Sequence, residues 1–123
     1  MLKSILLVGI GSFFGGALRY AVSLIMKNIT VQTFPWATLS VNLIGCFLLG
    51  LIFALFGKFS SVNSTMCLLL TTGFCGGFTT FSTFANESLQ MLQSGNFLGF
   101  VVYVLASLIL GIALVALGYY LVR

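Results

Sequence analysis

The sequence predicts an all-α membrane protein with four transmembrane helices, the third of which is broken at a glycine-rich segment. Of its 123 residues, 60% are hydrophobic and 5% are charged, whereas a soluble domain carries about 25% charged residues. Four apolar segments, at residues 4–26, 36–56, 65–92 and 97–122, reach the length of about 20 residues that crosses a bilayer. The segments between them are short, so residues 1–123 are expected to form a single four-helix transmembrane domain.

The first predicted span combines small residues with a cation. Gly11 and Gly15 form a small-xxx-small pair, which is typical of a close contact between two membrane helices. Ser12 and Arg19 lie on one face of the same helix. A guanidinium inside a membrane normally faces a water-filled cavity or a partner. Arg19 is therefore expected to make an aqueous vestibule attractive to anions, and the alternative is that it extends to the membrane interface.

The second and fourth spans each carry polar side chains on one face. In the second span, Thr38 and Asn42 are one helical turn apart. An asparagine there either joins neighbouring helices or offers its two N–H donors to a small anion. In the fourth span, Tyr103 and Ser107 have the same spacing, so both spans are expected to present hydroxyl or amide groups along one side.

Three glycines interrupt the third predicted span. Gly73, Gly76 and Gly77 lie close together in an apolar segment, and each glycine in a helix interior costs about 1 kcal/mol relative to alanine. Their spacing predicts a break in the helix. Broken backbone inside a membrane persists only where protein covers it or where it lines a polar pathway. Ions are therefore expected to contact this segment.

Aromatic and polar side chains follow the predicted break. Phe81 and Phe84 share one helix face, and a second face carries Thr80, Thr83 and Glu87. The ordinary role of such a phenylalanine pair is lipid contact or core packing. The alternative uses the electropositive edge of each ring, which can face an anion without holding it too tightly for it to leave. Glu87, the only acidic residue of the chain, is either a neutral, hydrogen-bonded acid or a carboxylate beside the pathway.

Charge and cysteine content exclude several classes of protein. The net charge of +4 comes from scattered lysines and arginines, whereas a nucleic-acid interface needs them clustered. Three cysteines without any histidine predict free thiols rather than a zinc site. With four spans, Lys3, Lys58 and Arg123 lie on one side of the membrane and Lys27 lies on the other. This small difference predicts either one fixed orientation or insertion in both, which would permit an antiparallel homodimer.

Three stretches of the sequence resemble the Fluc/CrcB family of fluoride channels. The most specific is Gly73 to Phe84, Gly-Phe-Cys-Gly-Gly-Phe-Thr-Thr-Phe-Ser-Thr-Phe, with Glu87 just after it. Gly-Ala-Leu-Arg-Tyr around Arg19 and Ala-Thr-Leu-x-x-Asn ending at Asn42 also match. The similarity extends over essentially the whole chain. One departure is Gly111, at a position where members of the family carry a serine.

The resemblance implies an antiparallel, dual-topology homodimer that conducts fluoride through two pores. A structural sodium ion (Na+) at the dimer centre would be held by the backbone carbonyls of Gly76 and Thr79 from each copy. Arg19 would lie near the vestibule. The residues implied to line or flank the fluoride pore are Asn42, Phe81, Phe84, Thr38, Thr83, Tyr103, Ser107 and Glu87.

The function that the resemblance implies is passive efflux of fluoride across a bacterial inner membrane, which gives resistance to fluoride. Fluoride that enters as HF ionises inside, and an interior-negative potential drives the anion out with about 2.3 kcal/mol per 100 mV. The sequence shows no nucleophile–base pair and no phosphate loop, so no enzyme is expected. The alternatives are a small dual-topology multidrug/proton antiporter, which requires an acidic residue that the first span lacks, and a non-transporting assembly subunit.

Overall fold

The computed structural model describes residues 1–29, 34–58 and 64–122. Its helices are α1 (Leu2–Ile29), α2 (Trp36–Lys58), α3 (Ser64–Leu68), the π-helix η1 (Leu69–Cys75), α4 (Gly76–Phe78), α5 (Phe81–Gln93) and α6 (Phe97–Val122). No strand occurs among these described residues. They contain four segments long and apolar enough to cross a membrane, the third made by α3 to α5. This confirms the predicted multi-pass, all-helical membrane protein. Arg123 and parts of the first two connections lie outside the described residues.

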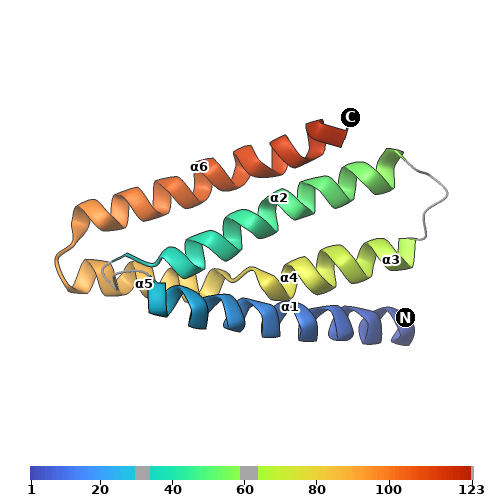
Figure 1. The fold of residues 1–123 in the computed structure, drawn as a ribbon, viewed down its shortest axis with the longest axis horizontal. Helices are drawn as coiled ribbons and strands as arrows, with labels where there is room; N and C mark the ends of the chain where they lie inside the picture. The colour runs from blue at the N-terminus through green and yellow to red at the C-terminus, as the bar shows by residue number, and fades with distance from the viewer. Residues whose placement is uncertain (30–33, 59–63, 123) are drawn as a thin grey trace.

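Helix α2 lies between α6 on one side and the pair formed by α1 and the third span on the other (Figure 1). Both termini lie at the end of the molecule where α2 ends and α3 begins. At this end the Lys58 ammonium donates to the Val122 carbonyl at 3.2 Å, which joins the ends of α2 and α6. Lys3 and Lys58 therefore share one end and Lys27 lies at the other, as the four-span prediction requires.

Glycines allow the third span to pack directly on the backbone of α1. A Cβ atom added to Gly77 would lie 2.7 Å from the Ser12 carbonyl oxygen, closer than real Cβ contacts occur. A Cβ atom on Gly11 or Gly15 would likewise overlap the backbone of η1. The close helix contact predicted at Gly11 and Gly15 is therefore confirmed, and its partner is the third span.

The break in the third span is real, but its predicted position is wrong. Gly76 and Gly77 are helical, in α4. The extended residues are Thr79 and Thr80. Thr79 has a φ of −88° and a ψ of 159°, and Thr80 has a φ of −148° and a ψ of 125°. The physical reason is that Gly77 is used for close packing on α1, which a helix can supply without a break. What replaces the helical hydrogen bonds is the Asn42 side chain, which pairs with both polar backbone groups of Thr80.

A tight turn joins α5 to α6 and caps both helices. The Gly95 N–H donates to the Leu92 carbonyl at 3.2 Å. The Asn96 N–H donates to the Met91 carbonyl at 2.9 Å, and Gly95 has a φ of 82°. This is the left-handed C-cap in which glycine is preferred. The Asn96 side chain then accepts from the Gly99 N–H at 3.0 Å, so the same turn begins α6.

Gly95→Ala is expected to destabilise the protein by about 1–2 kcal/mol, because the left-handed conformation costs an L-residue about that much. Crowding does not contribute, since an added Cβ atom would have no neighbour within 4 Å. Thermal unfolding in detergent measures the effect. Gly57→Ala is the matched control, because that position is equally open and has no positive φ. Equal melting temperatures for the two variants would contradict the prediction.

Candidate functional site

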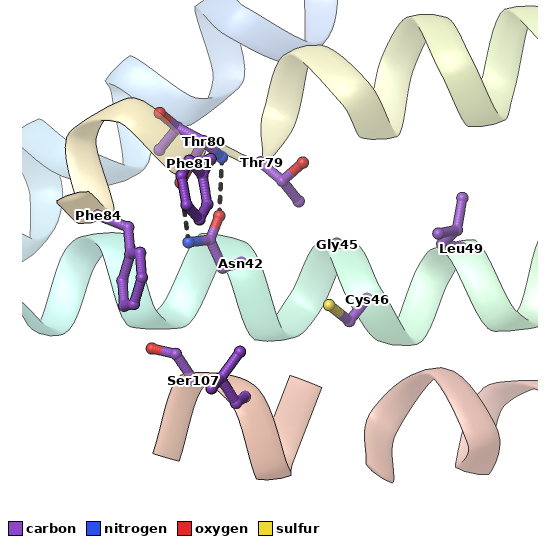
Figure 2. Close-up of a pocket in the computed structure, with 10 residues that line it drawn as sticks. Asn42, Gly45, Cys46, Leu49, Thr79, Thr80, Phe81, Phe84 and Ser107 are labelled. Carbon is purple, nitrogen blue, oxygen red and sulfur yellow. Dashed lines mark hydrogen bonds between the residues drawn. The ribbon is translucent and has the colours of Figure 1, made fainter. Parts of the chain in front are cut away.

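The site is built around Asn42, whose side chain extends from α2 to the break in the third span. Its Oδ1 accepts from the Thr80 N–H at 2.8 Å, and its Nδ2 donates to the Thr80 carbonyl at 3.1 Å (Figure 2). The amide therefore takes the place of the helical partners that Thr80 lacks. The helix-packing interpretation of Asn42 is confirmed. The amide also carries a second N–H that this pairing does not use.

A pocket of about 280 Å³ opens beside this pair, between α2, α6 and the break (Figure 2). The rings of Phe81 and Phe84 line it, with centroids 5.8 Å apart and planes inclined by 46°. Phe81 is 78% exposed, whereas Phe84 packs against the core around Tyr103. The complete lining is Asn42, Gly45, Cys46, Leu49, Thr79, Thr80, Phe81, Phe84, Ser107 and Leu108.

Ser107 brings an unsatisfied hydroxyl to this pocket from α6 (Figure 2). Within the described ranges, its Oγ is the one buried side-chain nitrogen or oxygen atom without a hydrogen-bond partner. Leaving such a group unpaired costs about 1–3 kcal/mol. The Ser107 hydroxyl is therefore available to donate to a small acceptor that enters the pocket.

A partly buried hydrogen bond lies near Phe84. The Tyr103 hydroxyl donates to Glu87 Oε1 at 2.9 Å, and the Tyr103 ring is fully buried, with its centroid 5.0 Å from that of Phe84. Glu87 also borders a second pocket, of about 520 Å³, between α5 and the residues that precede α2. Thr38 is buried on α2 and does not line the first pocket. Glu87 thus lies beside the pocket of Phe81 and Phe84 rather than in its wall.

Two side chains of α1 donate to carbonyls of the third span. Arg19 Nε donates to the Gly77 carbonyl at 3.2 Å, and the Ser12 hydroxyl donates to the Gly73 carbonyl at 3.2 Å. Arg19 is half-buried. Its guanidinium therefore contacts protein backbone, which argues against the alternative that it extends to the membrane interface. The vestibule role expected of Arg19 stays a prediction.

The bonds at the break also change the partners of two carbonyls. In a continuous helix the Thr80 N–H would donate to the Gly76 carbonyl, but here it donates to Asn42. The Thr83 N–H would likewise donate to the Thr79 carbonyl, but it donates to the Thr80 hydroxyl at 3.3 Å. The carbonyl end of one half-helix and the N–H end of the next therefore meet at the break. These ends carry partial negative and partial positive charge, and so favour a cation and an anion respectively.

The structure brings most of the predicted site residues together around the break. Those that line the pocket are Asn42, Thr79, Phe81, Phe84 and Ser107. The predicted site residues that do not line the pocket are Thr38, Thr83, Glu87, Tyr103, Gly76 and Arg19.

Sequence reasoning missed the role of Thr80. It caps α5, because its hydroxyl accepts from the Thr83 N–H, and it is the partner of Asn42. A signal was present, since a threonine just before a helix is a typical N-cap. The apolar lining residues Leu49 and Leu108 carry no comparable signal. All three cysteines are free thiols, as predicted, and the described residues contain no cluster of His, Cys, Asp and Glu suited to a metal.

Comparison with known proteins gives a consistent result. The family model described as CrcB-like protein, Camphor Resistance (CrcB), matches residues 6–119. A protein of Azobacteroides pseudotrichonymphae is 46% identical over 121 residues, which cover 98% of this chain and 97% of the relative. A relative from Phocaeicola vulgatus is 44% identical, and the match covers 95% of this chain and 96% of the relative. A relative from Leptospira interrogans is 39% identical, and the match covers 98% of this chain and 95% of the relative. All three carry the name fluoride-specific ion channel FluC, which describes a channel and not an enzyme.

Proposed function

This chain belongs to the CrcB-like family, and from that membership we propose that it is a fluoride channel of a bacterial inner membrane. Fluoride would cross passively, driven by an interior-negative potential that supplies about 2.3 kcal/mol per charge per 100 mV. Because HF enters a cell uncharged and ionises inside, such efflux would protect the cell from fluoride. No chemical step is required of the protein.

The observation that carries this proposal is the unsatisfied Ser107 hydroxyl in a pocket walled by two aromatic rings. Fluoride is a small hydrogen-bond acceptor, and Ser107 together with the unused N–H of Asn42 can donate to it. The electropositive edges of Phe81 and Phe84 add attraction without a strong bond. The N-terminal end of α5 favours negative charge at the same place. This combination partly replaces the hydration of the ion and still lets it leave.

The proposal includes an antiparallel homodimer with two pores. Ser82 and Asn86 are exposed on α5, next to the exposed ring of Phe81. Lipid cannot satisfy such polar groups within a membrane, which supports a second protein copy against this face. The few cations at either end of the helices bias insertion weakly, which is compatible with copies in both orientations. A two-fold axis would then present the same surface from each copy.

A structural sodium ion at the dimer centre is also part of the proposal. The carbonyls of Gly76 and Thr79 fit it, because the N–H groups that would occupy them in a helix donate elsewhere. Gly76 is exposed in the single chain, and the proposed dimer would place it against the second copy. Carbonyl oxygens at the end of a half-helix are suitable ligands for sodium. With two carbonyl ligands from each copy, the ion would stabilise the dimer.

Purified protein in liposomes loaded with potassium fluoride tests the proposed function. Addition of a potassium ionophore should release fluoride rapidly, because the ionophore removes the opposing voltage, and liposomes loaded with chloride should retain it. Retention of fluoride by liposomes that contain folded protein would reject a channel. Uptake of ethidium driven by a pH gradient would instead identify the antiporter.

Ser107→Ala is expected to reduce fluoride conduction without reducing the stability of the protein. Removal of an unsatisfied buried hydroxyl relieves a cost of about 1–3 kcal/mol, so the melting temperature in detergent should hold or rise. Fluoride efflux should fall about tenfold, because a hydrogen bond to a charged group is worth about 1.5–3 kcal/mol. Ser88→Ala is the control, since the Ser88 hydroxyl already donates to the Phe84 carbonyl at 2.8 Å and does not line the pocket. Full efflux by Ser107→Ala would remove this hydroxyl from the pathway.

A further inference from the structure

The break in the third span is held by side chains from two other spans. Asn42 of α2 pairs with the N–H and the carbonyl of Thr80, at 2.8 and 3.1 Å. Arg19 of α1 donates from Nε to the Gly77 carbonyl at 3.2 Å. The break is therefore supported from both sides of the third span, by groups that are distant from it in the sequence.

The bond made by Arg19 falls on one of the carbonyls that the break affects. A helix that ends leaves its last four carbonyls without helical donors, and here these belong to residues 76–79. Arg19 takes the carbonyl of Gly77. The first and last carbonyls of residues 76–79, those of Gly76 and Thr79, are the ones proposed to hold sodium. Arg19 thus anchors the backbone directly after Gly76 and two residues before Thr79.

We propose that Arg19 is a positioning residue for the cation site, and that it acts through its hydrogen bond to Gly77 rather than through its charge. This inference rests on the sodium ion of the proposed function. The contact fixes the α4 backbone on α1. Gly77 already packs closely on α1 there, because a Cβ atom added to it would lie only 2.7 Å from the Ser12 carbonyl oxygen. A fixed α4 keeps the Gly76 carbonyl in place when the break would otherwise allow the two half-helices to move independently.

Charge and position predict opposite effects, which makes the inference testable. Removing a positive charge near a cation site strengthens cation binding by Coulomb's law. Removing a group that positions the ligands weakens it, typically by about 10–100-fold. Arg19→Gln and Arg19→Met separate the two, because both lose the charge. Glutamine places an N–H donor at the atom that Arg19 Nε occupies, whereas methionine has a similar length and no donor.

The measurement is the sodium concentration that gives half of the thermal stabilisation of the dimer in detergent, with N-methylglucamine as the replacing cation. Arg19→Gln should keep the midpoint of the unaltered protein or lower it, and Arg19→Met should raise it about tenfold or more. Equal midpoints for the two variants, or no sodium-dependent stabilisation of the unaltered protein, would overturn the inference. If Arg19→Met does not fold, a tenfold higher midpoint for Arg19→Gln overturns it and an unchanged one supports it.

Fluoride efflux from liposomes, measured on the same proteins from low to saturating sodium, keeps the two proposals separate. If the unaltered protein releases no fluoride, the proposed channel function fails while the comparison of sodium midpoints still stands. Efflux by Arg19→Met that recovers at high sodium would agree with a positioning role, because more ion compensates for a weaker site. Efflux that stays low at every sodium concentration, with a midpoint equal to that of Arg19→Gln, would assign Arg19 to the anion path instead.

Discussion

Phe81→Ile is expected to reduce fluoride efflux from liposomes by about tenfold, which corresponds to about 1.4 kcal/mol on the barrier. Isoleucine keeps an apolar side chain at the pocket but removes the electropositive ring edge. Phe81 is 78% exposed within one chain, so the substitution removes little packing inside the four-helix domain and should leave each chain folded. Efflux is measured with a fluoride electrode after addition of the ionophore.

Phe84→Ile should reduce efflux as well, but it should also lower stability. The Phe84 ring packs 5.0 Å from that of Tyr103, and such a pair is worth about 0.5–1.5 kcal/mol beyond its buried area. Phe13→Ile is the matched control, because Phe13 is 70% exposed on α1 and does not line the pocket. Undiminished efflux in both pocket variants would reject a role for the ring edges.

Gly15→Ala is expected to destabilise the protein by about 1–3 kcal/mol, the usual cost of overpacking a tight contact. The new methyl group would overlap the Phe74 carbonyl, which is backbone and cannot turn aside as a side chain could. The α1 helix would have to move away from the third span and from the break that follows. Thermal unfolding in detergent, observed through the fluorescence of Trp36, measures the loss.

The neighbouring glycine supplies the control. A Cβ atom on Gly16 would have its nearest neighbour, the Gly77 carbonyl oxygen, at 4.0 Å, an ordinary contact distance. Gly16→Ala should therefore keep or raise stability, because alanine favours the helix over glycine by about 1 kcal/mol. If Gly15→Ala melts at the same temperature as Gly16→Ala or above it, the close packing of α1 on η1 is not what holds these helices together.

Much of the site could be predicted because its chemistry stands out in an apolar chain. The resemblance to the channel family implied that Asn42, Ser107 and the phenylalanine pair line an ion pathway, and the structure places all four in the lining of one pocket. Polar residues are costly within a membrane, so each one in a span points to a partner or a pathway. Apolar lining residues such as Leu49 could not be predicted, because they look the same as residues that face lipid.

The position of the break shows where local reasoning ends. Glycine propensity predicted the break at Gly73 to Gly77, but these residues are helical, and the extended backbone is at Thr79 and Thr80. Propensity is a weak local preference of about 1 kcal/mol for each glycine. It was overridden by packing of Gly77 on α1 and by two hydrogen bonds from Asn42, contacts between residues far apart in the chain.

By itself, the sequence determined four membrane spans, a third span that does not continue as one helix, and the polar side chains that an ion could meet. These follow from hydropathy and composition, because the bilayer demands about 20 apolar residues for each span and tolerates few polar ones. Only the tertiary structure decided that Arg19 bonds to Gly77 and that Asn42 pairs with Thr80. The reason is physical: these bonds depend on how closely α1 and α2 approach the third span, and that approach is set by packing across the whole bundle.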